Sequence, residues 1–405
     1  VRGGGPDQNL ILLDEAVVYN ASHLFGFFSV FNSDAINNID LIKGSMPANY
    51  GGRLASVLDI NMKDGNNKKF GMNGGIGLIS SKITVEGPLK KDTSSFIISG
   101  RRTYFDIFAK PFVDTTNFSG SSYHFFDLTT KMNYQLSPRN KIFLSGYFGR
   151  DVFNFNSKDW GFNMNMPWGN STASLRWNHL FNSNLFMNTS IIFSKYKYEF
   201  NISQELDSLP VSETNMFSGI RDWNIKNDFS YYPNLKHKIK FGTNYTYHKF
   251  TPTSFAGSYD DLELEQIINY YAHEYGLYIN DEYQVSERVL LNLGIRYSGF
   301  IQVGPFERHQ KDDSGQIGQI STDTIISYDR GEIVQSYGGM EPRFSFRYLI
   351  NENSSIKFGM MQNYQYLHLT SMASSSLPTD VWLPSSDIVK PQLGRQISLG
   401  YYKNL

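Results

Sequence analysis

The sequence contains no cysteine among its 405 residues. Neither a disulfide framework nor a thiolate metal site is therefore possible. The sequence also has no excess of basic charge, because 37 Lys and Arg residues stand against 38 Asp and Glu residues. Nucleic-acid-binding proteins usually show a strong basic excess, so we expect no nucleic acid as a partner.

Long hydrophobic runs are missing as well, and none approaches the roughly 18 apolar residues that a membrane-spanning helix needs. Charged residues make up only 19% of the chain, whereas aromatic residues make up 15%. This combination is typical of a transmembrane β-barrel, although a secreted all-β protein has a similar composition. No signal peptide precedes Val1, so we expect any targeting segment to have been removed or to lie outside this sequence.

The sequence also lacks catalytic motifs in the structural context that such motifs require. The eight His residues form no cluster with the spacing of a zinc site. No nucleophile elbow, phosphate-binding loop or dinucleotide-binding loop stands at a strand–helix junction. We therefore expect no enzymatic activity, no metal and no other cofactor.

The chain from about residue 70 onward is a series of alternating strands. Residues 126–136, for example, place Leu128 and Met132 on one face and Asp127 and Lys131 on the other. The period is two residues, which indicates strands and not helices. Many of the polar faces carry charges, and unpaired charges cannot all point into a dry core. These charged residues are Glu86, Lys131, Arg176, Lys226, Asp228, Lys240, Glu274, Glu282, Arg296, Arg343 and Arg347.

The connections between the strands distinguish a barrel from a sandwich. Very short turns are predicted at residues 89–94, 137–140, 182–184, 232–237, 286–287 and 351–354. Long segments lie between them, at residues 105–123, 151–169, 201–216, 250–268, 300–337 and 366–390. Short and long connections therefore alternate strictly, as in outer-membrane barrels with tight periplasmic turns and long extracellular loops. The predicted fold class is all-β, with a transmembrane antiparallel β-barrel of which about 14 strands are present.

Aromatic residues stand near the ends of many of these strands, as Trp177, Phe181, Trp223, Tyr231 and Tyr283 do. Such positions suit the aromatic girdles of a membrane barrel. The charged faces then belong to a wide lumen, where they contact water or a polar plug.

The first 66 residues have a different style, with short apolar stretches broken by Gly, Asn and Pro. Three stretches, VRGGGPDQNLILLDEAVVYN, HLFGFFSVFNSDAINNIDLIKG and PANYGGRLASVLDINMKDGN, closely resemble the C-terminal part of the plug of TonB-dependent outer-membrane receptors. Downstream, ISGRRTYFD, YFGRDVF, WGNSTASLRWNHLF and SLPTDVWLPSSDIVKPQ resemble the barrel of the same receptors. The branch is the Bacteroidetes type, with a carboxypeptidase-like regulatory domain and related to SusC-like receptors.

This resemblance implies a division into the C-terminal part of an α+β plug at residues 1–66 and the N-terminal part of the barrel at residues 67–405. The family fold implies 22 strands around the lumenal plug, so we expect a complete gene to add about eight strands and an N-terminal extension. One departure is Asp14-Glu15, where the commoner receptor pattern has Asp-Gly, and it leaves the type of this turn open.

The resemblance also implies candidate residues for a lock of opposite charges between plug and barrel. Arg2 and Lys43 match plug positions in or near such a lock, and Arg53 follows the glycine turn formed by Gly51 and Gly52. Ordinary structural ion pairing and simple turn chemistry explain the same residues.

Candidate ligand-binding residues lie in the long loops and at the apex of the plug. The loops supply Trp160, Phe162, Trp168 and Trp382, and the apex supplies His23, Phe25 and Phe28. Aromatic rings at a pore mouth stack on sugars, peptides or organic chelates, but they also pack loop against loop.

The preferred function is that of a TonB-dependent outer-membrane receptor and transporter of a Gram-negative bacterium, for a glycan, a peptide or a metal chelate. Its partners are then the TonB energy-transducing complex, reached through an N-terminal segment outside this sequence, and the lipid bilayer with its lipopolysaccharide. The alternative is a receptor-fold scaffold for a surface lipoprotein or another outer-membrane assembly. A passive porin is a third possibility, and the plug-like segment argues against it.

Overall fold

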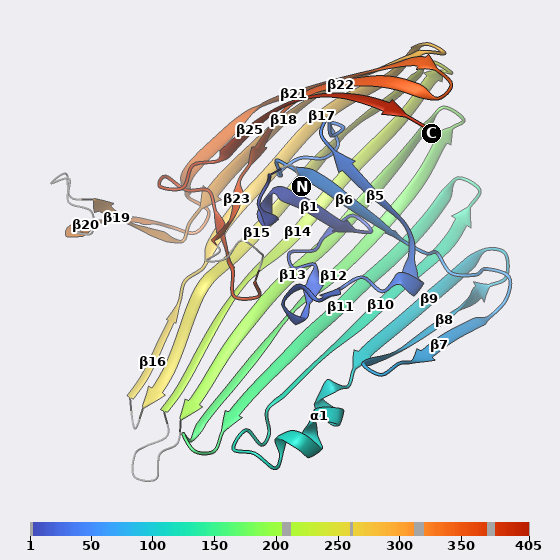
Figure 1. Cartoon of the computed structure of the whole chain (residues 1–405). Helices are drawn as coiled ribbons and strands as arrows, with labels where there is room; N and C mark the ends of the chain where they lie inside the picture. Colours follow the sequence, from blue (N-terminus) through green and yellow to red (C-terminus); the bar gives the residue numbers. More distant parts are fainter. Residues whose placement is uncertain (1–2, 205–211, 260–261, 312–319, 371–376, 405) are drawn as a thin grey trace.

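The computed structural model describes residues 3–204, 212–259, 262–311, 320–370 and 377–404, and it consists almost entirely of β-structure (Figure 1). A long, curved sheet forms a wall, and the N-terminal segment (residues 3–66) lies in its concave side. The only α-helix of the described residues is α1 (Phe105–Val113), which precedes β10. No helix in these ranges is long and apolar enough to cross a membrane.

The wall is one antiparallel sheet of 15 strands, in the order β25-β22-β21-β18-β17-β15-β14-β13-β12-β11-β10-β9-β8-β7, with β16 attached to β15. Its strands are β7 (Gly71–Ile76), β8 (Ser80–Lys90), β9 (Ser94–Thr103), β10 (Ser122–Ser137), β11 (Asn140–Ser157), β12 (Phe162–Asn182), β13 (Leu185–Gln204), β14 (Ser212–Asn234), β15 (His237–Tyr259), β16 (Leu262–Ile267), β17 (Tyr270–Ser286), β18 (Val289–Val303), β21 (Ile333–Asn351), β22 (Ser354–Gln365) and β25 (Gln392–Lys403). The path follows the order of the sequence, and only β16, β19, β20, β23 and β24 are passed over. In the described residues β7 and β25 are the two edges, so the sheet is curved but not closed.

All six predicted short turns are confirmed, because each joins two neighbouring strands of the wall. The predicted long segments need a correction. Residues 151–169 and 250–257 are strand for most of their length, since β11, β12 and β15 extend far beyond the apolar region. Two other connections carry hairpins of their own, β19 (Phe306–Lys311) with β20 (Ile320–Tyr328), and β23 (Leu367–Thr370) with β24 (Val381–Pro384). In the extensions of β11 and β12 the sequence alternates Phe and Met with Asn, whereas the extension of β15 carries polar residues on both faces.

The N-terminal segment is built on a small mixed sheet with the order β2-β1-β6-β5. Its elements are η1 (Pro6–Gln8), β1 (Asn9–Leu13), β2 (Ala16–Val17), β3 (Ser22–His23), η2 (Leu24–Gly26), β4 (Phe28–Ser29), η3 (Ser33–Ala35), β5 (Ile36–Lys43) and β6 (Ser56–Met62). Strands β1 and β6 run parallel, whereas β5 and β6 are antiparallel. The helices of residues 3–66 are 3₁₀ turns, so this part contains none of the α-helices expected from an α+β plug.

The Asp14-Glu15 turn joins β1 to β2 with two residues of positive φ, 44° and 75°. This is the geometry that Asp-Gly normally supplies, and a residue with a Cβ adopts it at a cost of about 1–2 kcal/mol. Both side chains contact other parts of the protein in compensation. Asp14 lies 3.0 Å from the ammonium of Lys131, and Glu15 accepts a hydrogen bond from Ser190 at 2.5 Å.

The small sheet packs against the wall on both of its faces. One face places Ile60 and Met62 in a buried cluster with Tyr147 of the wall. The opposite face places Val57 in a second cluster with Met361, on a distant strand of the wall. The N-terminal segment is therefore held across the concave side of the sheet and not merely attached to one strand.

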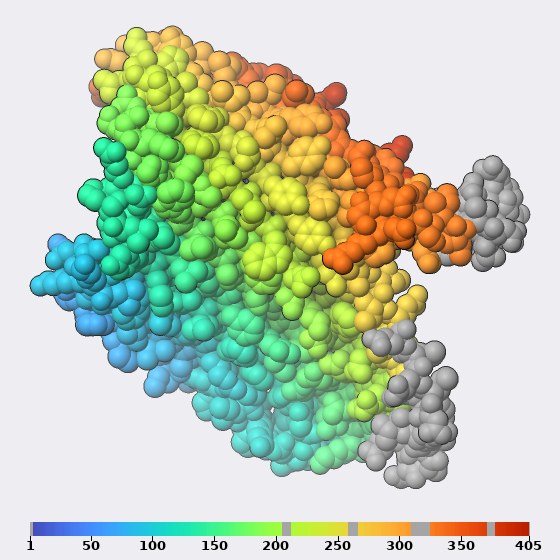
Figure 2. All heavy atoms as spheres, turned by 180° about the vertical axis from the view of Figure 1, so that it is seen from behind, coloured from blue at the N-terminus to red at the C-terminus, as the bar shows by residue number. Residues whose placement is uncertain are grey.

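The predicted alternation along the wall strands is confirmed, and its sense is the reverse of that in a soluble protein. On β10 the exposed side chains are apolar, as Leu128 (46%) and Leu136 (56%) show, whereas Asp127 and Lys131 are both buried at 3%. Exposed apolar side chains of this kind occur on many strands of the wall, for example Leu175, Ile191, Ile225, Ile279 and Leu293. Figure 2 shows the molecule from behind, with the wall strands side by side in the order of the sequence. A sheet with its polar face buried and its apolar face exposed is suited to a lipid environment.

Candidate functional site

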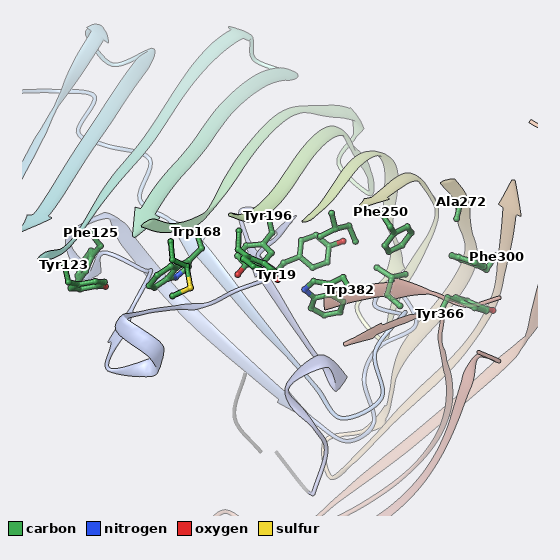
Figure 3. Packing of buried hydrophobic residues seen from close by; sticks show 14 residues of the cluster. Tyr19, Tyr123, Phe125, Trp168, Tyr196, Phe250, Ala272, Phe300, Tyr366 and Trp382 are labelled. Atoms are coloured by element: carbon green, nitrogen blue, oxygen red, sulfur yellow. The ribbon is translucent and has the colours of Figure 1, made fainter. Parts of the chain in front are cut away.

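A layer of aromatic rings joins the N-terminal segment to the inner side of the wall (Figure 3). Its members from the wall are Tyr123, Phe125, Trp168, Tyr196, Phe250, Phe300 and Tyr366, and they are all buried. Tyr19 enters this layer from the N-terminal segment, and Trp382 enters it from the connection between β22 and β25. The rings of Tyr19 and Trp382 meet edge to face with centroids 5.1 Å apart. The layer thus brings together residues from three regions that are far apart in sequence.

His23 is a fully enclosed polar side chain of this junction. It is 1% exposed, and its ring stacks on Phe125 with centroids 4.0 Å apart. Its Nδ1 lies 2.6 Å from Asp151 and its Nε2 lies 2.7 Å from Asp127, so both ring nitrogens contact carboxylates of the wall. Burial disfavours the charged imidazole, but the hydrogen bonds to the two carboxylates outweigh it and raise the pKa of His23.

The two carboxylates around His23 have further partners on the wall. The guanidinium of Arg101 donates to Asp127 at 2.5 to 2.7 Å, and the hydroxyl of Tyr147 donates to the same carboxylate at 2.8 Å. A protonated His23 and Arg101 together balance the charges of Asp127 and Asp151. The cluster is therefore a neutral, fully enclosed ionic contact between the N-terminal segment and strands β9 to β11.

A second buried cluster lies around Tyr19, on strands β14, β15 and β17. The Tyr19 hydroxyl donates to Asp222, which also contacts Nδ1 of His248 at 2.8 Å. Nε2 of His248 lies 3.5 Å from the carboxylate of Glu274. Burial, followed by the charge of Asp222, raises the pKa of Tyr19 well above its usual value, so this phenol stays a neutral donor.

A cavity of about 100 Å³ lies beside the second cluster, between the N-terminal segment and the wall. Its polar lining includes Glu15, Tyr19, Arg53, Asp222, Lys226, His248, Glu274 and Arg296. A space of this size and polarity is suited to several water molecules. The interface on this side of the N-terminal segment is therefore polar and incompletely packed.

Gly51 and Gly52, which form the glycine turn of the N-terminal segment, line this cavity. A Cβ on Gly51 would lie 2.5 Å from Nε of Arg296, so only glycine permits this close approach. Gly52 has φ +76°, a conformation that other residues rarely adopt. The two glycines therefore do more than form a turn. They let the backbone of the N-terminal segment approach the charged side chains of Arg296 and Glu274 on the wall.

The candidate lock residues have different surroundings. Arg2 lies outside the described residues, and Lys43 is exposed. Arg53 is 6% exposed, and its guanidinium lies over the Trp382 ring at 5.3 Å. The ion pairs that join the N-terminal segment to the wall involve other residues, chiefly Lys131 with Asp14 at 3.0 Å and Arg176 with Glu15 at 3.5 Å.

Five of the seven candidate ligand-binding residues lie at the aromatic layer. His23, Trp168 and Trp382 are buried there, Phe28 packs against it, and Phe25 is 41% exposed with its ring 5.3 Å from that of Trp168. The other two lie beyond the layer, near the turn that joins β11 to β12. Trp160 is 67% exposed at this turn, and Phe162 begins β12.

Several functional residues of the junction were not predicted from the sequence, among them Asp127, Asp151, Asp222 and His248. Each lies on the polar face of an alternating strand, and this pattern indicates only that its side chain faces the lumen. The pairing of these residues with His23 and Tyr19 depends on contacts across more than 100 positions of sequence. In the described residues, no group of three or more His, Cys, Asp or Glu side chains is arranged to hold a metal ion.

The fold is shared with solved outer-membrane receptors. The copper transporter OprC matches with a TM-score of 0.66 and 12% identity over 98% of this chain and 61% of its own. The ferric preacinetobactin receptor BauA from Acinetobacter baumannii matches with a TM-score of 0.60 and 12% identity over 99% and 61%. The ferric yersiniabactin uptake receptor FyuA from Yersinia pestis matches with a TM-score of 0.61 and 9% identity over 98% and 61%. The chain thus spans less than two thirds of the length of each.

No curated protein sequence matches the chain. A family profile, described as TonB dependent receptor-like, beta-barrel, does match it over residues 97–402, which is most of the wall. Three observations point to the same family: the wall strands have their polar face buried and their apolar face exposed, the N-terminal segment lies inside the curved sheet, and the family profile matches. The chain belongs to the TonB-dependent receptor family, in its β-barrel part.

Proposed function

We propose that the chain is part of an outer-membrane transporter that takes up a substrate when the N-terminal segment is remodelled by an energy-coupling partner. In this proposal residues 1–66 are the C-terminal part of the plug, and residues 67–405 are the first part of a barrel of 22 strands. The partner is the TonB complex, which acts on a segment that precedes this sequence.

The observation that carries this proposal is the set of buried polar contacts between the N-terminal segment and the wall, which interrupt the aromatic layer and the two apolar clusters of the same interface. Arg343 of the wall donates to the backbone carbonyls of Met46, Pro47 and Tyr50 at 3.3, 2.5 and 2.6 Å. The His23 and Tyr19 clusters and the Lys131–Asp14 pair are likewise polar. Contacts of this kind exchange for water when the segment moves, whereas a continuous apolar core would resist separation.

The substrate class that fits best is an organic metal chelate. The similar solved structures include a copper transporter, a ferric preacinetobactin receptor and a ferric yersiniabactin uptake receptor. The aromatic layer, with Phe25 half exposed beside Trp168, offers flat apolar surface of the kind that stacks on such ligands. Glycans and peptides remain competing substrates, and the Bacteroidetes, SusC-like branch remains part of the proposal.

A disulfide that ties the N-terminal segment to the wall tests the proposal directly, because the protein has no cysteine of its own. A Cβ on Gly294 would lie 3.0 Å from Cβ of Ala48, and disulfides need about 3.5–4.5 Å between these atoms. The double variant Ala48→Cys with Gly294→Cys is therefore expected to form a bridge after a small shift. Uptake of radiolabelled ferric chelates by intact cells should stop when the bridge forms and resume when it is reduced.

The single variant Ala48→Cys is the matched control and should transport at the wild-type rate with or without reductant. Gly294→Cys alone places its Cβ 2.7 Å from Oδ1 of Asn280, so its uptake is compared only with and without reductant and should not depend on it. Uptake that continues through the bridged protein would contradict the proposal. Normal growth of a deletion strain on all tested substrates, together with stable co-purification of a surface lipoprotein, would instead favour the scaffold function.

A further inference from the structure

Strand β13 reverses its pattern of polar and apolar residues part of the way along its length. In the part nearer the short turns, Ile191 is exposed on the outer face, whereas Ser190 and Ser194 are buried on the inner face. Beyond this part the outer face carries Lys195, Lys197, Glu199, Asn201 and Ser203. The inner face there carries Tyr196, Tyr198, Phe200 and Ile202. The strand thus turns its apolar side from the lipid to the lumen.

The neighbouring strands show the same reversal in register. Nearer the short turns, one outer row consists of the exposed residues Leu144, Leu175, Ile191 and Ile225. Further along the same four strands (β11, β12, β13 and β14), an outer row consists of Asn154, Asn165, Asn201 and Asn215. The Asn165 amide donates to Asn154 at 2.5 Å, and the Asn201 amide donates to Asn165 at 3.2 Å. Amide groups are costly to place in hydrocarbon, so this part of the wall belongs to the aqueous side of the lipid.

The inner side of these extensions carries Phe and Met in place of the charges found nearer the short turns. One row consists of Phe155, Met164 and Ile202. Two pairs beside it are Phe153 with Met166 and Phe200 with Met216. We call these seven residues the upper inner face. Met166 belongs to the aromatic layer, and Phe153 and Phe200 pack against it. The upper inner face therefore continues the layer outward, along the strands that run on past the N-terminal segment (Figure 1).

The upper inner face is only partly covered. Met166 is buried, and the other six residues are half-buried. The ring of Phe118, from the connection between β9 and β10, lies 5.5 Å from that of Phe155 and covers part of it. A contiguous apolar surface that is open to water and does not face lipid marks an interaction site.

The chemistry of the upper inner face indicates what binds there. None of its seven residues is charged or carries a side-chain hydrogen-bond donor. The charge next to it on β11 is that of Asp151, which is buried and engaged by His23. Aromatic rings and thioethers contact flat aryl and alkyl groups well. They give no counter-charge to a multiply charged anion and no donor to the hydroxyls of a sugar.

We propose that the upper inner face binds the apolar part of the substrate, and that this substrate is an uncharged metal chelate with aryl or alkyl groups. This assignment rests on the proposed function, because it concerns the ligand that the transporter takes up. It goes further by separating such a chelate from multiply charged anionic chelates, glycans and polar peptides. Methionine side chains adapt to groups of different shape, so the site selects the polarity of the ligand more strongly than its shape.

The experiment measures, by calorimetry, the binding of ferric complexes to the purified protein from the complete gene, in detergent and without any energy-coupling partner. Ferric tris(benzohydroxamate) is uncharged and carries phenyl groups, and ferric tris(acetohydroxamate) is uncharged and carries methyl groups. Ferric tris(catecholate) is aromatic but a multiply charged anion. The phenyl complex should bind at least about tenfold more tightly than either of the others, a factor that corresponds to one or two aromatic contacts of ordinary strength.

The double variant Phe155→Asn with Met164→Asn makes the inner row polar and should lose this preference for phenyl groups. Its matched control is Asn154→Ala with Asn165→Ala, which changes the same two strands at the same level on the outer face and should bind as the wild type does. The conservative variant Phe155→Leu with Met164→Leu keeps the row apolar and should keep most of the preference. The thermal midpoint of each variant shows whether a loss of binding is a loss of folding.

The comparison of the ferric complexes on the unchanged protein needs no variant, so it decides the substrate class even where a variant fails to fold. Equal affinity for the phenyl and methyl complexes would overturn the proposal, as would tighter binding of the catecholate anion or no binding of the phenyl complex. Unchanged binding by a folded Phe155→Asn, Met164→Asn variant would overturn it as well. Uptake that continues through the bridged Ala48→Cys, Gly294→Cys variant would contradict the transport mechanism and leave this binding site in place. Failure of the phenyl complex to bind, with uptake still stopped by the bridge, would remove this site alone.

Discussion

The two faces of the wall are made by the same strands, yet they follow opposite rules. On β14 the inner face carries Asp222 and Lys226, and the outer face carries Trp223 and Ile225, in strict alternation. The inner polar groups are enclosed by the N-terminal segment, whereas the outer apolar groups are exposed. The inner face is therefore stabilised by specific partners within the protein, and the outer face depends on a lipid environment.

The largest effect is expected where an inner-face charge loses its partner. Arg343 is 5% exposed and donates to Glu341 at 2.7 Å, and Glu341 is fully buried. Replacement of one member of a buried charge pair costs about 3–5 kcal/mol. Glu341 would keep the hydroxyl of Ser298 and the backbone N–H of Tyr364 as donors, and its remaining cation would be Arg296 at 3.9 Å. Arg343→Met should therefore lower the thermal midpoint sharply and make residues 3–66 sensitive to protease.

Arg347→Met is the matched control for this change. Arg347 lies four residues further on the same strand and the same face, but it is only partly buried and contacts no carboxylate among the described side chains. Its replacement should change stability by much less. If Arg347→Met lowered the thermal midpoint as much as Arg343→Met does, the stability would depend on the charged inner face as a whole and not on the Arg343–Glu341 pair.

The outer face should show the opposite sensitivity. Ile225 is 47% exposed on the apolar outer face, one row from Trp223, so a soluble protein would tolerate a charge there. On the lipid side of a membrane barrel, an Arg costs about 2–4 kcal/mol at the midplane and about 0–1 kcal/mol near the interfaces. Ile225→Arg should lower the free energy of unfolding from phospholipid bilayers by an amount between these limits, and Ile225→Phe should leave it nearly unchanged. An unchanged free energy for Ile225→Arg would contradict a lipid-facing position.

The alternation of the strands and the positions of the short turns were predictable, because both depend on local sequence. Residues 126–136 and the turn at 137–140 are examples, since period and turn residues suffice for them. The burial of the charged faces was predictable too, because unpaired charges require water or partners. The extension of β11 and β12 through residues 151–169 was not predicted, because many Asn residues and the turn around Gly161 favour a loop, although Asn alternates with Phe and Met there.

The partners across the junction depend on how the N-terminal segment sits in the curved sheet. His23 meets Asp127 and Asp151 only because β10 and β11 place both carboxylates at the same height on the inner face. The local sequence around His23 does not indicate at which level of the inner face these two carboxylates lie. The same holds for the lock residues: Lys43 is exposed, and the described ion pairs between the N-terminal segment and the wall include Asp14 with Lys131 and Glu15 with Arg176.

A smaller, pH-dependent effect is expected at His23 itself. The pKa of His23 is raised in the folded protein, and the unfolded value is about 6.5. The stabilisation from this group is therefore fully present below about pH 6.5 and is lost as the pH rises through the folded pKa. Between pH 6 and pH 9 the N-terminal segment should become more accessible, as measured by hydrogen exchange of residues 22–31.

His23→Gln supplies the comparison, because it keeps polar contact with the wall but cannot titrate. It should be less stable than the wild type at pH 6, by an amount in the range of about 1.5–3 kcal/mol for a hydrogen bond to a charged group. It should also lose the pH dependence of exchange between pH 6 and pH 9. A wild-type protein whose exchange does not change with pH would mean that the His23 charge does not hold the segment.

The smallest effect on stability is expected at Trp160, and it separates recognition from packing. Trp160 is 67% exposed at the turn between β11 and β12, whereas Trp168 is 2% exposed in the aromatic layer on the same strand pair. Trp160→Ala should change the free energy of unfolding by less than about 0.5 kcal/mol, as exposed sites usually do. Trp168→Ala should cost about 3–5 kcal/mol by leaving a cavity. Uptake measured beside the thermal midpoint then gives the role of each ring: a defect in Trp160→Ala without a change of midpoint indicates contact with substrate, and wild-type uptake would remove Trp160 from the candidate ligand-binding residues.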